Sequence, residues 1–242
     1  MLEKKIGRSI GSLHLATLRR AGAELVGTYA LVTVGCGAII VNALNGTLSD
    51  VGVAITFGLI VMVMISVLGH ISGAHFNPAV TIALALMRHF PWREVPVYIG
   101  SQMLGAVLGA LTLQILFGDV ANLGATIPQG RLSQALGLEV LLTAVLMFVI
   151  ASARTESNAP KFSAMMIGAT VTLDALWGGS ISGASMNPAR SFGPACVTGI
   201  WQAHWIYWLG PVVGAGLGVI IHQILNPPPR NNNIRKIAPG SR

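Results

Sequence analysis

The chain carries the same ten-residue window twice, and this duplication constrains its fold more than any other feature. ISGAHFNPAV at residues 71–80 returns as ISGASMNPAR at residues 181–190, with seven of the ten positions identical. Each window lies among three long apolar runs, two before it and one after it. If each run crosses a membrane, an odd number of crossings places the second copy upside down relative to the first. The sequence therefore predicts an inverted repeat.

The apolar runs have the length and composition of membrane spans. Runs of about 20 apolar residues are needed to cross a hydrocarbon core of about 30 Å. Only 10% of the residues are charged, against about a quarter in a soluble domain. Strict alternation of polar and apolar residues is absent, which argues against a transmembrane β-barrel. We expect an all-α, multi-pass integral membrane protein. Its six predicted spans are residues 21–44, 51–69, 95–117, 133–153, 162–179 and 204–225.

The basic residues lie almost entirely on one side of these spans. The net charge is +7, and 13 of the 15 Lys and Arg residues precede the first span, follow the sixth, or lie in two connections on that same side. The positive-inside rule makes this side cytoplasmic, with both termini there. This placement argues against nucleic acid as a partner. We expect the location to be a plasma membrane or a bacterial inner membrane.

Each window has the signature of a helix start. Asn is a favoured N-cap and Pro fits the first helical position, so Asn-Pro-Ala opens a short helix at 77–87 and again at 187–197. About eleven residues rise only about 16 Å, half the hydrocarbon thickness. Two such half-helices entering from opposite faces meet tip to tip at mid-membrane. The residues predicted to meet there are Asn77, Pro78, Ala79, Asn187, Pro188 and Ala189.

This meeting point predicts a filter for uncharged molecules. Each helix N-terminus carries roughly half a positive charge and unpaired N–H donors. The donors suit a neutral polar guest, while the charge repels cations and protons. We expect a passive channel with no catalysis, no cofactor and no metal, whose partners are the bilayer, water and small uncharged solutes. It comprises a channel domain at 21–226, with repeats at about 21–117 and 133–226, between a basic N-terminal tail at 1–20 and a C-terminal tail at 227–242.

Several polar residues lie inside or beside the apolar spans. Glu24 and Glu139 occupy equivalent places near the start of each half, which favours a scaffold that accepts hydrogen bonds from the windows over a proton relay. We assign His70 and His75, which flank the first window, to the same loop scaffold, with a pH gate as the alternative. Asp174 lies in the fifth span, and the sequence leaves open whether it pairs with a neighbour or lines the outer vestibule.

On these residues the chain resembles the aquaporin, or major intrinsic protein, family. The resemblance covers about 20–226 and rests on the paired SGxxxNPA windows, Arg190 after the second window, the two glutamates, and AMMIGATVTL in the fifth span. It implies an aquaporin-like fold of six tilted transmembrane helices and two re-entrant half-helices. It also implies one pore per subunit and a homotetramer.

The family's spacing from the asparagines also implies an outer constriction made of Phe57, Ala175, Ala184 and Arg190. Strict water channels carry His at the position of Ala175 and often Cys or Thr at that of Ala184. Two methyl groups leave a wider opening, and Arg190 still supplies a fixed charge. We therefore expect passage of water together with glycerol, urea, ammonia, hydrogen peroxide or metalloid hydroxides.

Two other classes of function remain open from the sequence. A secondary transporter of a small polar solute also uses inverted repeats with broken helices, and saturable, gradient-coupled uptake would identify one. A structural membrane protein with a minor pore role would need an adhesive outer face. The outer loops at 45–50 and 118–132 are short and plain for that purpose.

Overall fold

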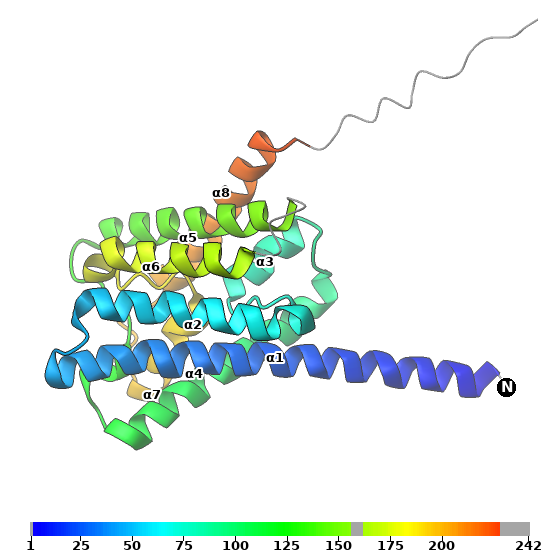
Figure 1. Cartoon of the computed structure of the whole chain (residues 1–242), viewed down its shortest axis with the longest axis horizontal. Helices are drawn as coiled ribbons and strands as arrows, with labels where there is room; N and C mark the ends of the chain where they lie inside the picture. Colours follow the sequence, from blue (N-terminus) through cyan, green and yellow to red (C-terminus); the bar gives the residue numbers. More distant parts are fainter. Residues whose placement is uncertain (1, 156–161, 228–242) are drawn as a thin grey trace, which may run out of the picture.

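The computed structural model describes residues 2–155 and 162–227, which form helices and short connections (Figure 1). The predicted all-α membrane fold is confirmed, because six of the helices are long and apolar enough to cross a membrane. The helices are α1 (Leu2–Asn45), α2 (Ser49–Ser72), α3 (Pro78–Leu86), η1 (Trp92–Glu94), α4 (Val95–Phe117), η2 (Ala121–Gly124), α5 (Leu132–Thr155), α6 (Ser163–Ser182), α7 (Pro188–Thr198) and α8 (Ile206–Leu225).

The two remaining α-helices are the predicted half-helices. Helix α3 has 9 residues and α7 has 11, so at about 1.5 Å per residue neither reaches across the membrane alone. They lie toward opposite ends of the bundle in Figure 1. Helix α1 differs from its predicted span, because it begins at Leu2 and so includes residues that we expected to form a separate tail. Most of the predicted C-terminal tail, residues 228–242, lies outside the described residues.

Equivalent helices pair within each half of the chain. Helix α1 packs on α4 and α5 packs on α8, while α2 and α6 join the halves. Small residues permit these approaches: a Cβ atom at Gly105 would collide with the carbonyl oxygen of Leu25, and one at Gly214 would collide with that of Val140. The glycines spaced by four in the third span of each half therefore mark close helix contacts.

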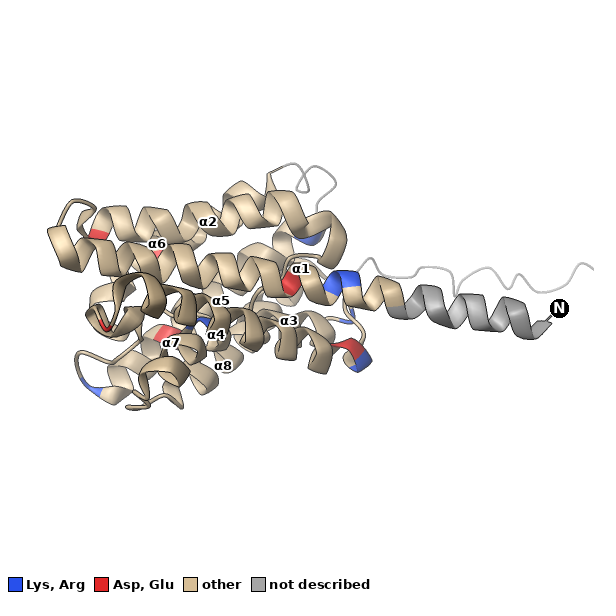
Figure 2. Cartoon of the chain, turned by 90° about the horizontal axis from the view of Figure 1, so that it is seen from below, with Lys and Arg blue, Asp and Glu red and all other residues tan. Residues whose placement is uncertain are grey.

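Charged residues are sparse along the helices of the bundle (Figure 2). We call the side on which α1 begins and α2 and α5 end the tail side, and the side on which α1 and α4 end the loop side. At the tail side Arg20 forms an ion pair with Glu94, at 3.0 Å, that ties α1 to η1. Most of the bundle surface consists of exposed large apolar side chains, which suits contact with lipid.

Candidate pore

The asparagine of each window caps a half-helix. The Asn77 side chain accepts a hydrogen bond from the backbone N–H of Ala79 at 2.9 Å. The Asn187 side chain accepts from Ala189 at 3.0 Å and from Arg190 at 3.3 Å. Each asparagine is extended, and a proline occupies the first helical position after it. The local geometry is thus the N-cap geometry that the Asn-Pro pair favours.

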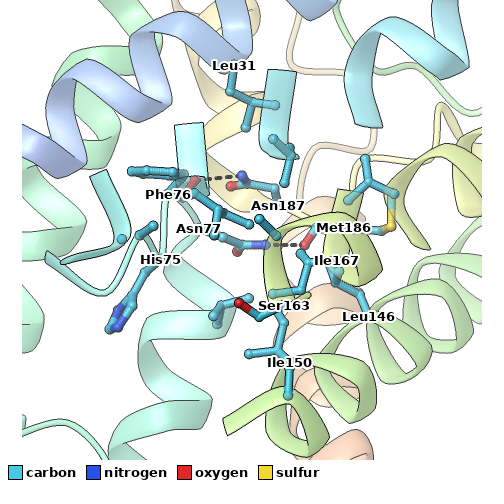
Figure 3. A pocket seen from close by; sticks show the side chains of 18 of the residues that line it. Leu31, His75, Phe76, Asn77, Leu146, Ile150, Ser163, Ile167, Met186 and Asn187 are labelled. Atoms are coloured by element: carbon cyan, nitrogen blue, oxygen red, sulfur yellow. Dashed lines mark hydrogen bonds between the residues drawn. The ribbon is translucent and has the colours of Figure 1, made fainter. Parts of the chain in front are cut away.

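The two caps also bind each other's loops. The Asn77 amide donates to the carbonyl oxygen of Met186 at 2.7 Å, and the Asn187 amide donates to that of Phe76 at 2.8 Å (Figure 3). These bonds join residues 109 and 111 positions apart in the sequence. Since an amide nitrogen carries two hydrogens, each asparagine keeps one further donor for another partner. The half-helices therefore meet tip to tip, as the duplication predicts.

The loops before the caps share an uncommon backbone. We call residues 73–77 the first re-entrant loop and residues 183–187 the second. Gly73 and Gly183 have φ of 86° and 88° and end α2 and α6 in the left-handed conformation. The first loop then places Ala74 and Phe76 at φ of 50° and 51°, and the second places its two equivalent residues in the same region. Residues with a Cβ atom hold this conformation only where their surroundings stabilise it.

For the first loop, that stabilisation comes from Glu24, which is fully buried in α1. Its carboxylate accepts hydrogen bonds from Ser72 Oγ at 2.6 Å, from the backbone N–H groups of His75 and Phe76 at 2.9 and 2.7 Å, and from Gln102 Nε2 at 2.7 Å. A carboxylate can accept several donors at once, and buried N–H groups require partners. Glu24 thus holds the loop from behind the passage.

Glu139 in α5 repeats this arrangement for the second loop. It is also fully buried, and it accepts from Ser182 Oγ at 2.8 Å and from the backbone N–H groups of Ser185 and Met186 at 2.9 and 2.8 Å. Every donor to Glu139 has an equivalent donor to Glu24. The equivalence seen in the sequence is therefore an equivalence of hydrogen bonds.

Sequence reasoning missed a pair of tyrosines that complete each scaffold. Tyr98 donates to the carbonyl oxygen of Ser72 at 2.8 Å, and Tyr207 donates to that of Ser182 at 2.7 Å. Both rings are fully buried. A signal was present, since each tyrosine lies seven residues before a glycine that packs closely in the third span of its half.

A single cavity of about 720 Å³ passes the two asparagines. All four residues of the implied outer constriction line it, as do His70 and His75. Arg190 lies within this cavity with its guanidinium carbon 5.0 Å from the centre of the Phe57 ring. The cavity therefore brings together the predicted filter and the implied constriction, whereas the two glutamates lie behind its wall.

The connection at 118–131 is less plain than we expected. The carbonyl oxygen of Gly124 accepts a 2.7 Å hydrogen bond from Arg190 Nη1, which fixes the guanidinium at the constriction. Thr126 Oγ1 donates to Ser191 Oγ at 2.8 Å, and the backbone N–H of Gln129 donates to the carbonyl oxygen of Ile181. This connection folds inward and positions the arginine, a role that composition alone does not indicate.

The histidines and Asp174 fall in different surroundings. His75 is buried, and its Nδ1 lies 3.2 Å from Thr81 Oγ1. His70 is exposed at the tail-side end of the cavity and shows no hydrogen bond among the described residues, which differs from the expected packing against the loop. Asp174 is buried beside Ala175, bonds the side chain of Trp177, and leaves Oδ2 without a hydrogen-bond partner. It does not line the cavity.

An inverted repeat of membrane helices around one cavity is an architecture that membrane channels share with secondary transporters, and family membership decides between the two classes. The sequence profile of the Major intrinsic protein family matches residues 12–222. The chain is 50% identical over 206 residues to Aquaporin NIP1-1 of Oryza sativa subsp. japonica, covering 84% of this chain and 72% of that protein. It is 44% identical over 223 residues to Nodulin-26 of Glycine max, covering 91% and 82%.

A solved structure shows the same fold. The X-ray structure of the aquaglyceroporin from Plasmodium falciparum superposes with a TM-score of 0.73 at 27% identity, covering 86% of this chain and 95% of that one. The chain belongs to the major intrinsic protein family, which confirms the resemblance drawn from the paired windows. It is accordingly a channel and not an enzyme.

Proposed function

We propose that this protein is a passive channel that conducts water and small uncharged solutes and excludes ions and protons. The observation that carries the proposal is the cavity in which the amides of Asn77 and Asn187 and the guanidinium of Arg190 all face one passage. Family membership supports the same function.

The filter acts by offering hydrogen-bond donors and positive potential, and none of the residues that line the cavity is acidic. Each asparagine retains an N–H that a passing oxygen can accept, and each half-helix presents its positive end to the same region. A cation or a proton loses hydration there and meets like charge, whereas a neutral guest exchanges its bonds to water for bonds to the amides. Arg190, buried and fixed by Gly124, adds a full charge.

The constriction sets the size of the guests. Ala175 and Ala184 contribute only methyl groups, and Phe57 contributes an apolar wall beneath the guanidinium. We infer that these side chains leave an opening wider than a single file of water molecules needs. We therefore propose that glycerol, urea, ammonia, hydrogen peroxide and metalloid hydroxides also pass, and the likeness to a protein described as an aquaglyceroporin supports a wide pore.

Stopped-flow measurements on proteoliposomes test this proposal. Shrinkage in sucrose reports water flux, and recovery in glycerol or urea reports solute flux. We expect Ala175→Trp to lower glycerol flux more than tenfold and water flux less, because the new ring narrows the constriction. Leu176→Trp is the matched control, since Leu176 is 44% exposed on the outside of the bundle. Absence of any solute recovery in the unaltered protein would contradict the wide pore.

We also propose the assembly and orientation that accompany this function. Membership of the major intrinsic protein family supports a homotetramer with one pore per subunit. Native mass spectrometry of the detergent-purified protein would identify it as a mass of four chains. The basic residues at the tail side support a cytoplasmic location for both termini. Protease access to a terminal tag in sealed, right-side-out membranes checks the orientation, and cleavage there would contradict it.

A further inference from the structure

The cavity ends at the tail side beside a second arginine that the filter does not explain. Arg154 lies in the last turn of α5 and lines the cavity together with His70, His75 and Ser163. In Figure 3, His75, Ser163 and Ile150 lie on the opposite side of the two asparagines from Leu31. Arg154 belongs to this tail-side mouth, whereas Arg190 belongs to the constriction at the loop side.

The Arg154 guanidinium is held in place by the first re-entrant loop. Its Nη2 donates to the carbonyl oxygen of Gly73 at 3.1 Å. A Cβ atom built on Gly73 would lie 3.3 Å from His75 Nε2 and 3.4 Å from Arg154 Nη2, so ring and guanidinium share one side of the loop. Gly73 ends α2, where the carbonyl groups carry the negative end of the helix dipole. The hydrogen bond to Gly73 and the negative end of α2 therefore hold the positive charge of Arg154 at the tail-side mouth of the cavity.

No acidic side chain lines the mouth within the part of the chain that the structure describes. Arg154 forms no ion pair there, and its side chain is exposed to the mouth. The carboxylate that interacts with Arg154 is that of Glu24, which lies buried behind the first re-entrant loop and accepts hydrogen bonds from the N–H groups of that loop. The other titratable groups that line the mouth among the described residues are His70 and His75, and neither carries negative charge. An entering cation consequently meets net positive potential before it reaches the asparagines.

The two arginines have parallel geometry. Arg190 donates to the carbonyl oxygen of Gly124 at one mouth, and Arg154 donates to that of Gly73 at the other. They differ in burial, because Arg190 is buried and Arg154 is exposed. We propose that Arg154 is a second charge-selecting residue of this pore, which repels cations at the tail-side mouth and leaves neutral solutes unaffected. The inference rests on the proposed channel function.

A charge series at position 154 tests the inference. Because Arg190 alone is expected to exclude K⁺, the effect of Arg154 on K⁺ influx is measured in an Arg190→Ala background. Arg190→Val serves as the second background if the Arg190→Ala protein does not insert into membranes. Proteoliposomes with Arg154, Arg154→Lys, Arg154→Gln and Arg154→Glu are compared for K⁺ influx by a trapped dye and for water flux by stopped flow. We expect Arg154→Gln to raise K⁺ influx about fivefold, the effect of a unit charge at roughly 4 Å in water.

The charge series separates electrostatics from a structural role for Arg154. Arg154→Lys should match Arg154, Arg154→Glu should exceed Arg154→Gln, and water flux should stay unchanged throughout. The matched control is Arg93→Gln, which removes an exposed tail-side charge that does not line the cavity. Equal K⁺ influx across the series, or a lysine variant that behaves like the glutamine variant, would overturn the role of Arg154. Absent water flux in the unaltered protein would instead contradict the channel function itself.

Discussion

The two re-entrant loops share one scaffold and differ in what they present to the pore. In each loop a buried glutamate binds two backbone N–H groups, and a serine and a tyrosine secure the end of the preceding helix. The position after the Asn-Pro-Ala tripeptide is Val80 in the first loop and Arg190 in the second. The symmetric residues therefore support the loops, while an asymmetric residue supplies the charge.

The side chains that pack against the two re-entrant loops also differ between the two halves. Behind the first loop His75 packs against Phe90 and Tyr98, with ring centres 4.8 and 5.1 Å away. Behind the second loop Ser185 takes the equivalent place and bonds the carbonyl oxygen of Asn187 and the hydroxyl of Ser191. The 118–131 connection contacts this side of the second loop, since Thr126 bonds Ser191 and Gly124 bonds Arg190. Departure from symmetry thus creates the constriction.

The largest effect should follow loss of a scaffold glutamate. Glu24→Ala and Glu139→Ala each leave at least two buried backbone N–H groups without an acceptor, at roughly 1–3 kcal/mol apiece. We expect neither variant to be recovered as a monodisperse protein. Glu24→Ala should be the less stable of the two, because Gln102 also loses one of its two hydrogen bonds and keeps only the bond to Thr81. Size-exclusion profiles measure this, with the exposed Asp119→Ala as control. A well-behaved Glu24→Ala protein would contradict the scaffold role.

Removal of a cap should come next in size. Asn77→Ala and Asn187→Ala each lose a cap and a bond to the opposite loop, which together cost roughly 2–3 kcal/mol. We expect the larger loss for Asn187→Ala, because its side chain accepts from two backbone N–H groups rather than one. Thermal unfolding in detergent measures the difference, and Asn226→Ala at the exposed end of α8 is the control. Equal losses would indicate that the cross-loop bonds dominate.

The packing behind the loops should give a smaller and unequal effect. His75→Ala removes two ring contacts and the hydrogen bond to Thr81, at roughly 2 kcal/mol. Ser185→Ala removes three hydrogen bonds of a small side chain, one of them the long 3.4 Å bond from the backbone N–H of Asn187, at roughly 1–1.5 kcal/mol in total. Thermal unfolding, with the exposed His89→Ala as control, should rank the histidine variant as the less stable. The reverse ranking would show that the second loop depends more on its polar contacts.

The smallest expected effect is the part of the pH dependence that comes from His204, because the equivalent residue in the first half, Val95, does not titrate. His204, just before α8, occupies the place that buried Val95 holds before Tyr98, and burial lowers the pKa of His204 below its ordinary value of 6.5. Folding then favours the neutral ring, so its contribution to stability is complete above about pH 6.5 and declines as the pH falls. We expect His204→Gln to reduce the drop in melting temperature between pH 7.5 and 5.5 by about 1–3 °C. If the decrease in melting temperature between pH 7.5 and 5.5 is the same in the His204→Gln variant, His204 is not the source of the acid sensitivity.

Much of this architecture could be predicted because membrane spans and caps are local signals. Apolar length identified six spans, and Asn-Pro identified both half-helix starts to within a residue. The duplication then required opposed orientations. Tyr98, Gln102 and Thr126 escaped prediction because a single polar residue in a span or loop carries no mark of its distant partner. Arg154 escaped for the same reason, since its place in the cavity depends on how α5 ends beside the first loop.

The sequence by itself determined that two half-helices start in the membrane from opposite faces, because composition, cap chemistry and an odd span count are properties of neighbouring residues. Only the tertiary structure decided which groups line the passage and which support it from behind. Glu24 and Glu139 are acids within membrane spans, which could line a pore or support it. In the folded protein they do not line the cavity, and they accept hydrogen bonds from backbone N–H groups of the re-entrant loops. Such assignments arise where segments about fifty residues apart satisfy one another's buried polar groups.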